Sequence, residues 1–349
     1  MKSHQAVEYG KPLELIETAT PEPQGSEVLV RVEACGVCHS DVHLWEGSFD
    51  LGGGNRLDVT RGRTLPFTFG HEIVGEVVAL GPDAQGATPG ERRVVYPWIG
   101  CGACATCSSG EEHLCPASQA LGVGRAGGYA DHVVVPDARY LFDAGDVPVG
   151  LAGTYACSGV TAYSALRKAE SRATGRQLLI IGAGGVGMAG LAIAREIIDA
   201  EIWVADIDPQ KLDAAREAGA DHVVDTRDAE AVKSVMKGTG GGAAAAVDFV
   251  GAESSAAFGW NTLARGGKLV IVGLFGGSFS APLPFFPIKS VTVQGSYVGS
   301  PGEMGELMEL VRSGRIPPIP VETRPIADVT RTLEDLRAGR IVGRVAVRP

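Results

Sequence analysis

Residues Leu178–Gly187 read LLIIGAGGVG, an apolar run followed by the pattern G-x-G-x-x-G. The apolar run predicts a buried strand, and the pattern of residues 186–198 predicts a helix. Between them, Gly182 permits a tight turn, Gly184 lets backbone amides approach a pyrophosphate, and Gly187 allows close helix-to-strand packing. The stretch therefore predicts the start of a dinucleotide-binding unit; the alternative is an ordinary glycine-rich turn.

An acidic residue follows at the distance expected of such a unit. Asp206 ends the next apolar run, 19 residues after Gly187, where a carboxylate can accept hydrogen bonds from the adenosine ribose diol. It would repel the 2′-phosphate of NADP, and Ile207 offers no guanidinium to hold that phosphate, so the pattern favours NAD. Asp208 adds charge nearby, but it suits equally well the N-cap of a helix beginning at Pro209.

Strands and helices alternate on both sides of this stretch. Strands are expected at 178–181, 201–205, 222–224, 245–250 and 268–272, and helices at 186–198, 209–218, 229–237 and 254–263. Such alternation implies a doubly wound parallel sheet in an α/β protein. Earlier residues are mostly β, with expected strands at 28–33, 73–80, 93–96 and 132–135 between Gly and Pro turns. Helices at 301–313 and 326–338 and a strand at 344–347 follow.

These patterns divide the chain into domains. Its 349 residues exceed the size of a single hydrophobic core, roughly 250–300 residues. We expect a first domain over 1–157 with a cysteine-rich lobe near 98–116, a dinucleotide-binding domain over 158–294, and a return to the first domain over 295–349. The glycine triplets at 52–54 and 240–242 are expected at loop tips.

Composition excludes several classes of protein. A net charge of −10 without a basic patch argues against a nucleic-acid partner. The longest weakly polar run, 178–194, has 17 residues and falls short of the ~20 that span a membrane. The N-terminus lacks the apolar stretch of a secretory signal, which predicts a cytoplasmic location. Seven cysteines, an odd number in a reducing compartment, suggest metal ligation more than disulfides.

Four of these cysteines form a compact motif, Cys101-x2-Cys104-x2-Cys107-x7-Cys115. Four thiolates can close a tetrahedral zinc cage with no vacant position, which is typical of a structural site. The alternatives are an iron–sulfur cluster and four ordinary buried thiols. Pro116 follows the last cysteine as in bacterial ferredoxins, but the gap of seven residues before it is longer than in the ferredoxin motif.

The other candidate metal ligands are scattered along the chain. Cys38 opens the run CHSDVH, which ends at His43; His71 stands in Gly70-His71-Glu72; and Cys157 precedes the dinucleotide-binding stretch. Taken singly, each is more often a packed core residue than a ligand. It is their joint order that points to a metal site.

The chain resembles the zinc-dependent medium-chain alcohol dehydrogenases over essentially its whole length, and most of all the prokaryotic, NAD-dependent, often tetrameric members. The segments that carry the resemblance are Gly36–Asp41, Gly70–Glu72, the four-cysteine motif, Gly182–Gly187, Asp206 and Gly343-Arg344. The resemblance implies a mostly β, GroES-like catalytic domain formed by both chain ends, and a Rossmann domain between them. It also implies NAD and two zinc ions per subunit.

The resemblance assigns roles to residues around the catalytic zinc. It implies that Cys38, His71 and Cys157 bind this zinc and leave the fourth position to water or substrate, the ligand set expected of alcohol dehydrogenases. Glu72 is similar to the family's nearby carboxylate, which contacts the metal transiently. Asp41 is similar to the acid that orients the histidine ligand.

Further roles concern the proton and the cofactor. By resemblance, Ser40 accepts the substrate's proton and His43 passes it to solvent, with a turn residue as the alternative for Ser40. Lys211 would reach the adenosine ribose and Arg344 the pyrophosphate, although each could be a surface charge. Cys35 matches no ligand and is expected to be a packing residue; Cys35-x2-Cys38 also fits a redox pair. The full set assigned to the cofactor is Gly182, Gly184, Gly185, Val186, Gly187, Asp206, Lys211 and Arg344.

The resemblance also suggests a substrate pocket. Its expected lining residues are Phe49, Trp98, Ala120, Leu274 and Tyr297. That wall is apolar and carries no cation for a carboxylate or phosphate, which favours medium-chain, cyclic or aryl alcohols over ethanol. Ala120 stands where some relatives have tryptophan, which leaves room, and residues 49–63 are expected to be a mobile loop at the pocket's edge.

Other functions remain open. On the same scaffold, the protein could be a polyol dehydrogenase or a zinc-dependent carbonyl reductase, whereas a zinc-free quinone reductase would leave the cysteines without purpose. From another class, it could be a non-catalytic zinc- and nucleotide-binding protein. We expect a homo-oligomer, a tetramer more than a dimer, with no nucleic-acid or membrane partner.

Overall fold

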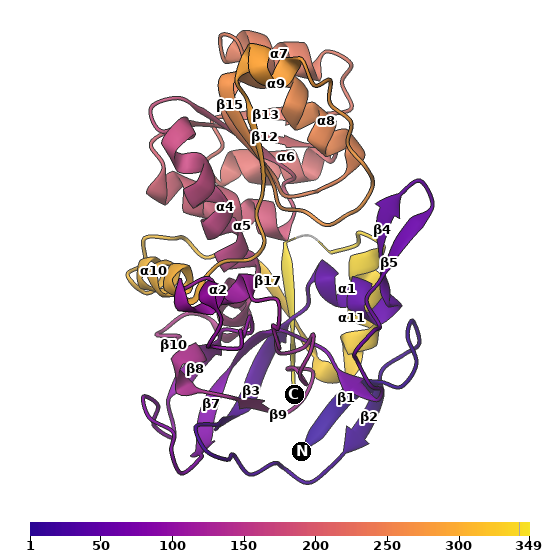
Figure 1. The fold of residues 1–349 in the computed structure, drawn as a ribbon, viewed down its shortest axis with the longest axis vertical. Coiled ribbons are helices and arrows are strands. Elements are labelled where there is room, and N and C mark those ends of the chain that lie inside the picture. Colours follow the sequence, from indigo (N-terminus) through magenta and orange to yellow (C-terminus); the bar gives the residue numbers. More distant parts are fainter. Residues whose placement is uncertain (342) are drawn as a thin grey trace. The chain divides into compact units, whose positions relative to one another are not determined.

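The computed structural model describes residues 1–341 and 343–349 and contains two compact units (Figure 1). Unit 1 comprises Met1–Ser48, Asp58–Val160 and Gly299–Pro349, and unit 2 comprises Phe49–Leu57 and Thr161–Val298. The functional division expected at 157 and 294 stays a prediction.

A six-stranded parallel sheet forms the centre of unit 2. Its strands stand in the order β13-β12-β11-β14-β15-β16, which is 3-2-1-4-5-6 in chain order and is the arrangement of dinucleotide-binding Rossmann folds. The strand order reverses between β11 and β14, beside which ligands bind at the carboxyl ends of the strands. The strands are β11 Gln177–Ile181, β12 Glu201–Asp206, β13 His222–Asp225, β14 Ala243–Asp248, β15 Leu263–Ile271 and β16 Thr292–Gly295.

Helices alternate with these strands along the chain (Figure 1). The central strand β11 is buried at four of its five positions because a parallel sheet is covered on both faces, which explains its continuous apolar run. The core of unit 2 includes Leu179, Ile181, Trp203, Phe258 and Leu269. The helices are α4 Ser158–Ala173, which begins in unit 1, α5 Gly185–Ile197, α6 Pro209–Glu217, α7 Ala231–Gly238, α8 Glu253–Asn261 and α9 Phe285–Lys289.

Unit 1 is built on a seven-stranded sheet in the order β10-β8-β7-β3-β18-β17, with β9 also paired to β3. Both chain ends contribute to it, since β18 pairs antiparallel with β3, with Ala346 opposite Gly36. The strands are β3 Val28–Gly36, β7 Glu72–Leu80, β8 Arg92–Val95, β9 His132–Val135, β10 Leu141–Asp143, β17 Val321–Pro325 and β18 Arg344–Arg348, and a separate sheet contains β1 Lys2–Ala6, β2 Glu14–Glu17 and β6 Phe67–Thr68.

Short helices connect these strands and carry most of the candidate ligands. They are α1 His39–Glu46, α2 Ala105–Ser108, η1 Glu112–Leu114, η2 Ala138–Tyr140, α3 Val149–Ala152, η3 Gly153–Ala156, α10 Pro301–Arg312, η4 Ile326–Asp328 and α11 Val329–Arg337. Among the described residues, no helix has the length and apolar character needed to cross a membrane.

The expected mobile loop over 49–63 contains a β-hairpin instead. Strands β4 (Ser48–Gly52) and β5 (Asn55–Asp58) pair with each other, and Gly53 and Gly54 between them both have positive φ, 60° and 80°. Two consecutive left-handed residues are what a two-residue type I′ hairpin turn requires. The glycine triplet thus belongs to a defined turn, and only residues 59–63 of this segment lie outside the hairpin.

Candidate functional site

Four buried side chains from three separate segments of unit 1 meet at one point. Cys38 caps the N-terminus of α1, Glu72 begins β7 just after His71, and Cys157 lies between η3 and α4. The ligand atoms of these four side chains all lie within 4.8 Å of one another, and all four residues are buried. The structure therefore brings together the residues that sequence reasoning assigned to the catalytic zinc.

Their spacing fits a metal ion. The His71 Nε2 and Cys157 Sγ atoms are 3.2 Å apart, and two such ligands on a tetrahedral zinc would lie about 3.6 Å apart, from metal bonds of about 2.0–2.3 Å. Glu72 Oε1 is buried and has no hydrogen-bond partner among the described residues. A buried carboxylate oxygen without a donor is costly, and a cation bound among these side chains would remove that cost.

Asp41 connects two of the candidate ligands. Its Oδ1 lies 3.0 Å from His71 Nδ1, and its Oδ2 accepts the Cys38 backbone N–H at 2.9 Å. The first contact leaves Nε2 of the histidine as the metal-binding nitrogen, as in many zinc sites. The Trp98 ring lies 5.3 Å from the His71 ring, and its indole N–H donates to Ala156 O at 2.9 Å.

Arg344 is paired with Glu72. Its guanidinium forms a buried ion pair with Glu72 Oε2, and a side chain at Gly36 would collide with this carboxylate. Sequence reasoning placed Arg344 at the cofactor's pyrophosphate and missed this partner. The two residues meet because β3 lies between their strands in the sheet: β18, which begins with Arg344, pairs with β3, and β3 pairs with β7, which begins with Glu72. The pyrophosphate role stays a prediction, and Arg344 Nε has no partner among the described residues.

Burial and mutual contacts shift the pKa values of all four side chains in this group. The contact with Cys157 lowers the pKa of the Cys38 thiol, and the same contact, with burial, raises the pKa of Cys157. Burial lowers the pKa of His71, but the Asp41 carboxylate and Cys38 together raise it above its usual value. Burial also raises the pKa of Glu72 to about 7, although Arg344 opposes that shift.

The two residues expected to move a proton lie on α1. Ser40 Oγ is 3.8 Å from Cys38 Sγ, and His43 lies one helical turn further. Burial lowers the pKa of His43, so the neutral imidazole that can accept a proton is favoured. Cys35 is fully buried, is a free thiol and lies outside the metal-ligating groups of the described residues.

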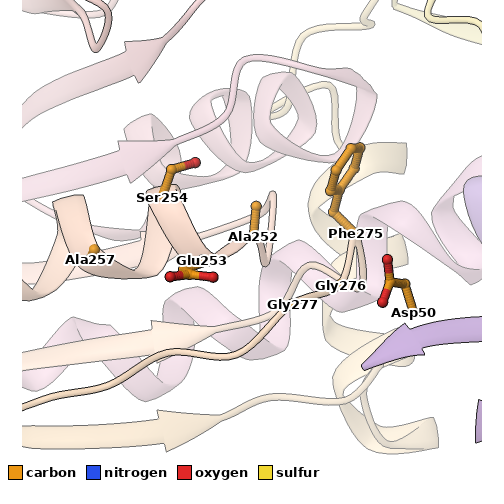
Figure 2. A pocket seen from close by; sticks show the side chains of 8 residues that line it. All are labelled: Asp50, Ala252, Glu253, Ser254, Ala257, Phe275, Gly276 and Gly277. Carbon is orange, nitrogen blue, oxygen red and sulfur yellow. The ribbon is translucent and has the colours of Figure 1, made fainter. Parts of the chain in front are cut away.

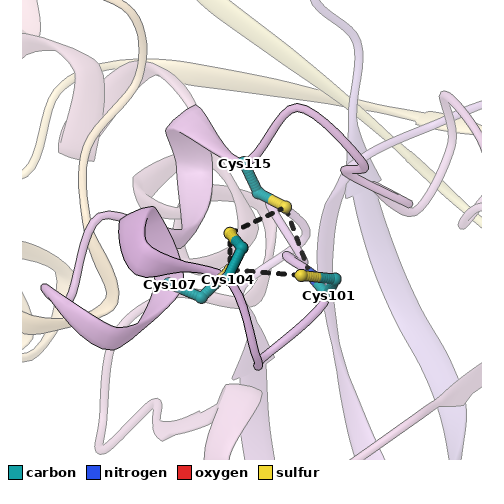
Figure 3. A group of neighbouring side chains, drawn as sticks. All are labelled: Cys101, Cys104, Cys107 and Cys115. Carbon is teal, nitrogen blue, oxygen red and sulfur yellow. Dashed lines mark hydrogen bonds between the residues drawn. The ribbon is translucent and has the colours of Figure 1, made fainter.

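The second group consists of Cys101, Cys104, Cys107 and Cys115 (Figure 3). The Sγ–Sγ distances are 3.5 Å from Cys104 to Cys107, 3.9 Å from Cys101 to Cys107 and 3.9 Å from Cys104 to Cys115. Four sulfurs held at about 2.3 Å by one tetrahedral zinc lie about 3.8 Å apart. The cysteines thus form a closed, zinc-sized cage, and all four are free thiols.

Glu112 fastens this cage to the rest of unit 1. Its buried carboxylate accepts the Tyr140 hydroxyl at 2.6 Å and the Gly100 N–H at 3.4 Å, and it pairs with Arg139 at 2.9 Å. Burial and this carboxylate raise the pKa of Tyr140, so the hydroxyl stays protonated and donates. Sequence reasoning missed this cluster, because its members are distant in the chain.

The glycine-rich turn in unit 2 has the expected form. Gly182 has φ +94°, and a side chain there would meet Val250 Cγ2 at 2.6 Å. A Cβ at Gly187 would collide with the Gly182 carbonyl, whereas a Cβ at Gly184 would have no heavy atom within 4 Å. Gly184 thus leaves open space at the N-terminus of α5, where Gly185 and Val186 begin the helix and a phosphate group is favoured.

Asp206 lies beside this turn at the end of β12. Its carboxylate accepts N–H bonds from Ala183 at 2.7 Å, Ile207 at 2.7 Å and Asp208 at 3.0 Å. Asp208 caps α6 through Gln210 N, as the sequence suggested, and Lys211 lies in the first turn of that helix. Asp206 therefore fixes the turn, and its ribose contact stays a prediction.

The residues expected to line a substrate pocket are divided between the units. Trp98 and Ala120 are buried in unit 1, whereas Phe49, Leu274 and Tyr297 belong to unit 2, so their joint pocket stays a prediction. Unit 2 itself contains a hollow of about 550 Å³ beside the hairpin (Figure 2). Its lining residues are Asp50, Ala252, Glu253, Ser254, Ala257, Phe275, Gly276 and Gly277.

Comparisons with known proteins agree with this arrangement. Residues 24–146 match the family model "Alcohol dehydrogenase GroES-like domain", and residues 185–313 match "Zinc-binding dehydrogenase". An NAD-dependent alcohol dehydrogenase of Sulfurisphaera tokodaii is 37% identical over 100% of both chains. These matches confirm the predicted fold class, a Rossmann domain with a GroES-like domain.

Solved structures give the same result. An alcohol dehydrogenase from Aeropyrum pernix is 30% identical, covers 100% of both chains and has a TM-score of 0.90. An acetophenone reductase from Geotrichum candidum, solved with NAD, is 27% identical with a TM-score of 0.85, covering 99% of this chain and 97% of its own. A D-arabinose dehydrogenase from Sulfolobus solfataricus is 26% identical with a TM-score of 0.84 over 100% of both chains. The chain therefore belongs to the zinc-dependent medium-chain alcohol dehydrogenase family.

Proposed function

We propose that the protein is an NAD-dependent alcohol dehydrogenase that interconverts medium-chain, cyclic or aryl alcohols and their aldehydes or ketones. The observation that carries the proposal is the contrast between its two cysteine groups. The four-cysteine group is closed, whereas the second group contains Cys38, His71 and Cys157 together with Glu72, whose carboxylate is paired with Arg344. While Glu72 stays with Arg344, the two thiols and the imidazole leave a coordination position for substrate.

The metal-holding residues have distinct roles in this proposal. Cys38, His71 and Cys157 would hold a catalytic zinc, which when bound supplies a Lewis acid that lowers the pKa of a substrate hydroxyl, while NAD accepts hydride. Asp41 keeps Nε2 of His71 turned toward the metal through its contact with Nδ1. Trp98, packed on the His71 ring, keeps water from that side of the imidazole.

The cofactor would be held by unit 2. The open space at Gly184 receives the pyrophosphate at the N-terminus of α5, and Asp206 accepts hydrogen bonds from the adenosine ribose. Lys211, in the first turn of α6, reaches the same ribose. One further contact would come from outside unit 2: Arg344, in unit 1, would bind the pyrophosphate through its guanidinium, whose Nε has no partner among the described residues.

Proton transfer would follow α1. Ser40 takes the proton of the substrate hydroxyl, and His43, one turn further along the helix, passes it on to solvent. The lowered pKa of His43 keeps its imidazole neutral between turnovers, so that the ring can accept the next proton.

The proposed substrate class rests on the apolar character of the residues expected to contact the substrate, none of which is a cation that could bind a carboxylate or phosphate. Trp98, Ala120, Phe49, Leu274 and Tyr297 offer contacts worth about 0.8 kcal/mol per buried methylene and few hydrogen bonds for a polyol. The likeness to an acetophenone reductase supports an aryl substrate. A polyol or sugar dehydrogenase is the second candidate, and the likeness to a D-arabinose dehydrogenase favours it.

Steady-state kinetics on a panel of alcohols test this proposal. The zinc-loaded enzyme should reduce NAD with benzyl alcohol and cyclohexanol at higher kcat/KM than with ethanol, and glycerol, sorbitol and D-arabinose should rank last. A higher kcat/KM for the polyols or the sugar would establish the second candidate. Turnover of no member of the panel would favour a non-catalytic zinc- and nucleotide-binding protein.

We also propose that the protein is a homo-oligomer, a tetramer before a dimer, in the cytoplasm. Leu283, Phe285 and Ile288, on and next to α9, expose 79%, 45% and 56% of their surface, and such apolar patches commonly mark subunit contacts. All seven cysteines are free thiols, which fits a reducing compartment. Light scattering of the purified protein and fractionation of its host cells test the two statements.

A further inference from the structure

The β4–β5 hairpin belongs to unit 2, although the chain on both sides of it belongs to unit 1. Gly47, which ends α1, donates its N–H to His43 O at 2.9 Å and accepts the Val59 N–H at 3.1 Å. The two legs of the hairpin therefore meet at the C-terminal turn of α1. This helix begins directly after Cys38, so a short covalent path leads from the candidate catalytic metal group to unit 2.

Glycines let the hairpin lie close against the segment that follows β15 within unit 2. A Cβ added to Gly52 would lie 2.9 Å from both Cα and C of Gly277, and a Cβ added to Gly276 would lie 2.6 Å from the Asp50 carbonyl oxygen. Real Cβ atoms do not approach other atoms so closely, so these backbones touch only because the side chains are missing. We call the contact between Asp50–Gly52 and Gly276-Gly277 the glycine clasp; Figure 2 shows Asp50 beside Gly276 and Gly277.

The clasp rests on the segment that follows β14. Phe275 N–H donates to Val250 O at 3.2 Å, and Gly276 N–H donates to Gly251 O at 3.1 Å. The buried Asp248 carboxylate in turn accepts hydrogen bonds from the N–H groups of Val250 at 2.9 Å and Gly251 at 3.1 Å. A continuous series of contacts therefore joins Asp248, at the end of β14, to the segment after β15, and that segment to the hairpin.

These contacts lie at the edge of the sheet where a dinucleotide is expected to bind. Both supporting segments leave the carboxyl ends of β14 and β15, and ligands of doubly wound sheets bind outside these ends. A ligand that orders them would order the hairpin too, because the glycine clasp leaves no flexible side chain between the backbones.

We propose that Gly52 and Gly276 are positioning residues whose backbone contacts fix the hairpin on unit 2, so that binding of the dinucleotide orders the hairpin and the C-terminal turn of α1. That turn contains His43, one turn from Ser40. The proposal rests on the proposed function for the identity of the ligand and the reaction.

The hairpin offers a matched pair of variants. Gly52→Ala and Gly54→Ala both place alanine at nearly the same positive φ, +79° and +80°, and so carry the same backbone strain, but only the first collides with Gly277, since Gly54 has no heavy atom within 4 Å of an added Cβ. Gly276→Ala disturbs the clasp from the other side. Hydrogen–deuterium exchange of peptides covering 43–58, with and without NADH, is measured for all variants.

In the unmodified protein and Gly54→Ala, NADH should slow exchange over 43–58 by about fivefold or more, as expected when a locally opening segment becomes ordered. Gly52→Ala and Gly276→Ala should lose this protection and exchange faster than Gly54→Ala even without NADH. Their kcat on the best alcohol should fall about tenfold, whereas their NADH dissociation constant should stay within about twofold, because ordering of α1 affects the reacting state.

Two results would overturn the proposal. Equal exchange rates in Gly52→Ala and Gly54→Ala would show that the glycine clasp does not order the hairpin. Loss of NADH protection in Gly54→Ala as well would show that backbone strain in the hairpin, and not the clasp, causes the effect. Failure of the proposed function is distinguishable. In that case NADH would protect no peptide of the unmodified protein, Gly182–Gly187 included, while the comparison without NADH would still test the clasp.

Discussion

Replacing Glu112 by glutamine should loosen the metal held by the four-cysteine group. The variant keeps the size of the side chain and one oxygen acceptor but loses the negative charge of the carboxylate that accepts a hydrogen bond from the Tyr140 hydroxyl at 2.6 Å. A hydrogen bond to a buried charged group contributes about 1.5–3 kcal/mol, against about 0.5–1.5 kcal/mol for a neutral one. The Arg139 pair adds little, because that side chain is 50% exposed.

Glu112→Gln should therefore destabilise the metal-bound group by about 1–2 kcal/mol. At 1.4 kcal/mol per factor of ten, this weakens metal retention about 5–30-fold. The assay is the rate of zinc transfer to a chelating dye, with Glu111→Gln as control because Glu111 is the exposed preceding residue. Zinc release from Glu112→Gln as slow as from Glu111→Gln would refute the role of this carboxylate.

Three further variants test other contacts. Asp206→Ser should lower the ratio of kcat/KM for NAD over NADP by about tenfold or more, since a charged acceptor is lost and a repulsive charge removed; an unchanged ratio would exclude the ribose contact. Ala120→Trp should reduce kcat/KM for benzyl alcohol and cyclohexanol and spare ethanol; an equal loss for all three with a lower melting temperature would place Ala120 in the packed core instead. Asp41→Asn should weaken zinc binding at the catalytic group by about 10–100-fold and leave the four-cysteine group unaffected, as expected when a partner of a ligating histidine is changed; equal zinc retention at both groups would count against it.

Local sequence patterns were sufficient for most of unit 2. The apolar run at 178–181 became β11, and the glycine-rich turn leads into α5 as expected. These elements are predictable because each strand is buried on both faces and each turn needs glycine at a defined position. The order of the six strands then follows from the general rules for such sheets.

The hairpin at 48–58 differs from the expected flexible loop, because three consecutive glycines fit a mobile loop tip as well as a tight turn. The consecutive glycines at the turn are also a hairpin signal, and a Cβ at Gly52 would collide with Gly277, a contact between residues far apart in the chain. The Arg344–Glu72 and Glu112–Tyr140 contacts were missed for the same reason. They join residues separated by 272 and 28 positions, and no local periodicity reports such pairs.

Zinc analysis of three purified proteins tests the central claim most directly, namely that one chain holds a structural and a catalytic zinc in separate groups. The unmodified protein should contain two zinc ions per chain. Cys38→Ala should contain one, remain folded and oxidise no alcohol, whereas Cys104→Ala should lose stability, because a structural zinc contributes directly to folding. A single zinc ion or iron in the unmodified protein, or alcohol oxidation by Cys38→Ala at the unmodified rate, would contradict the account.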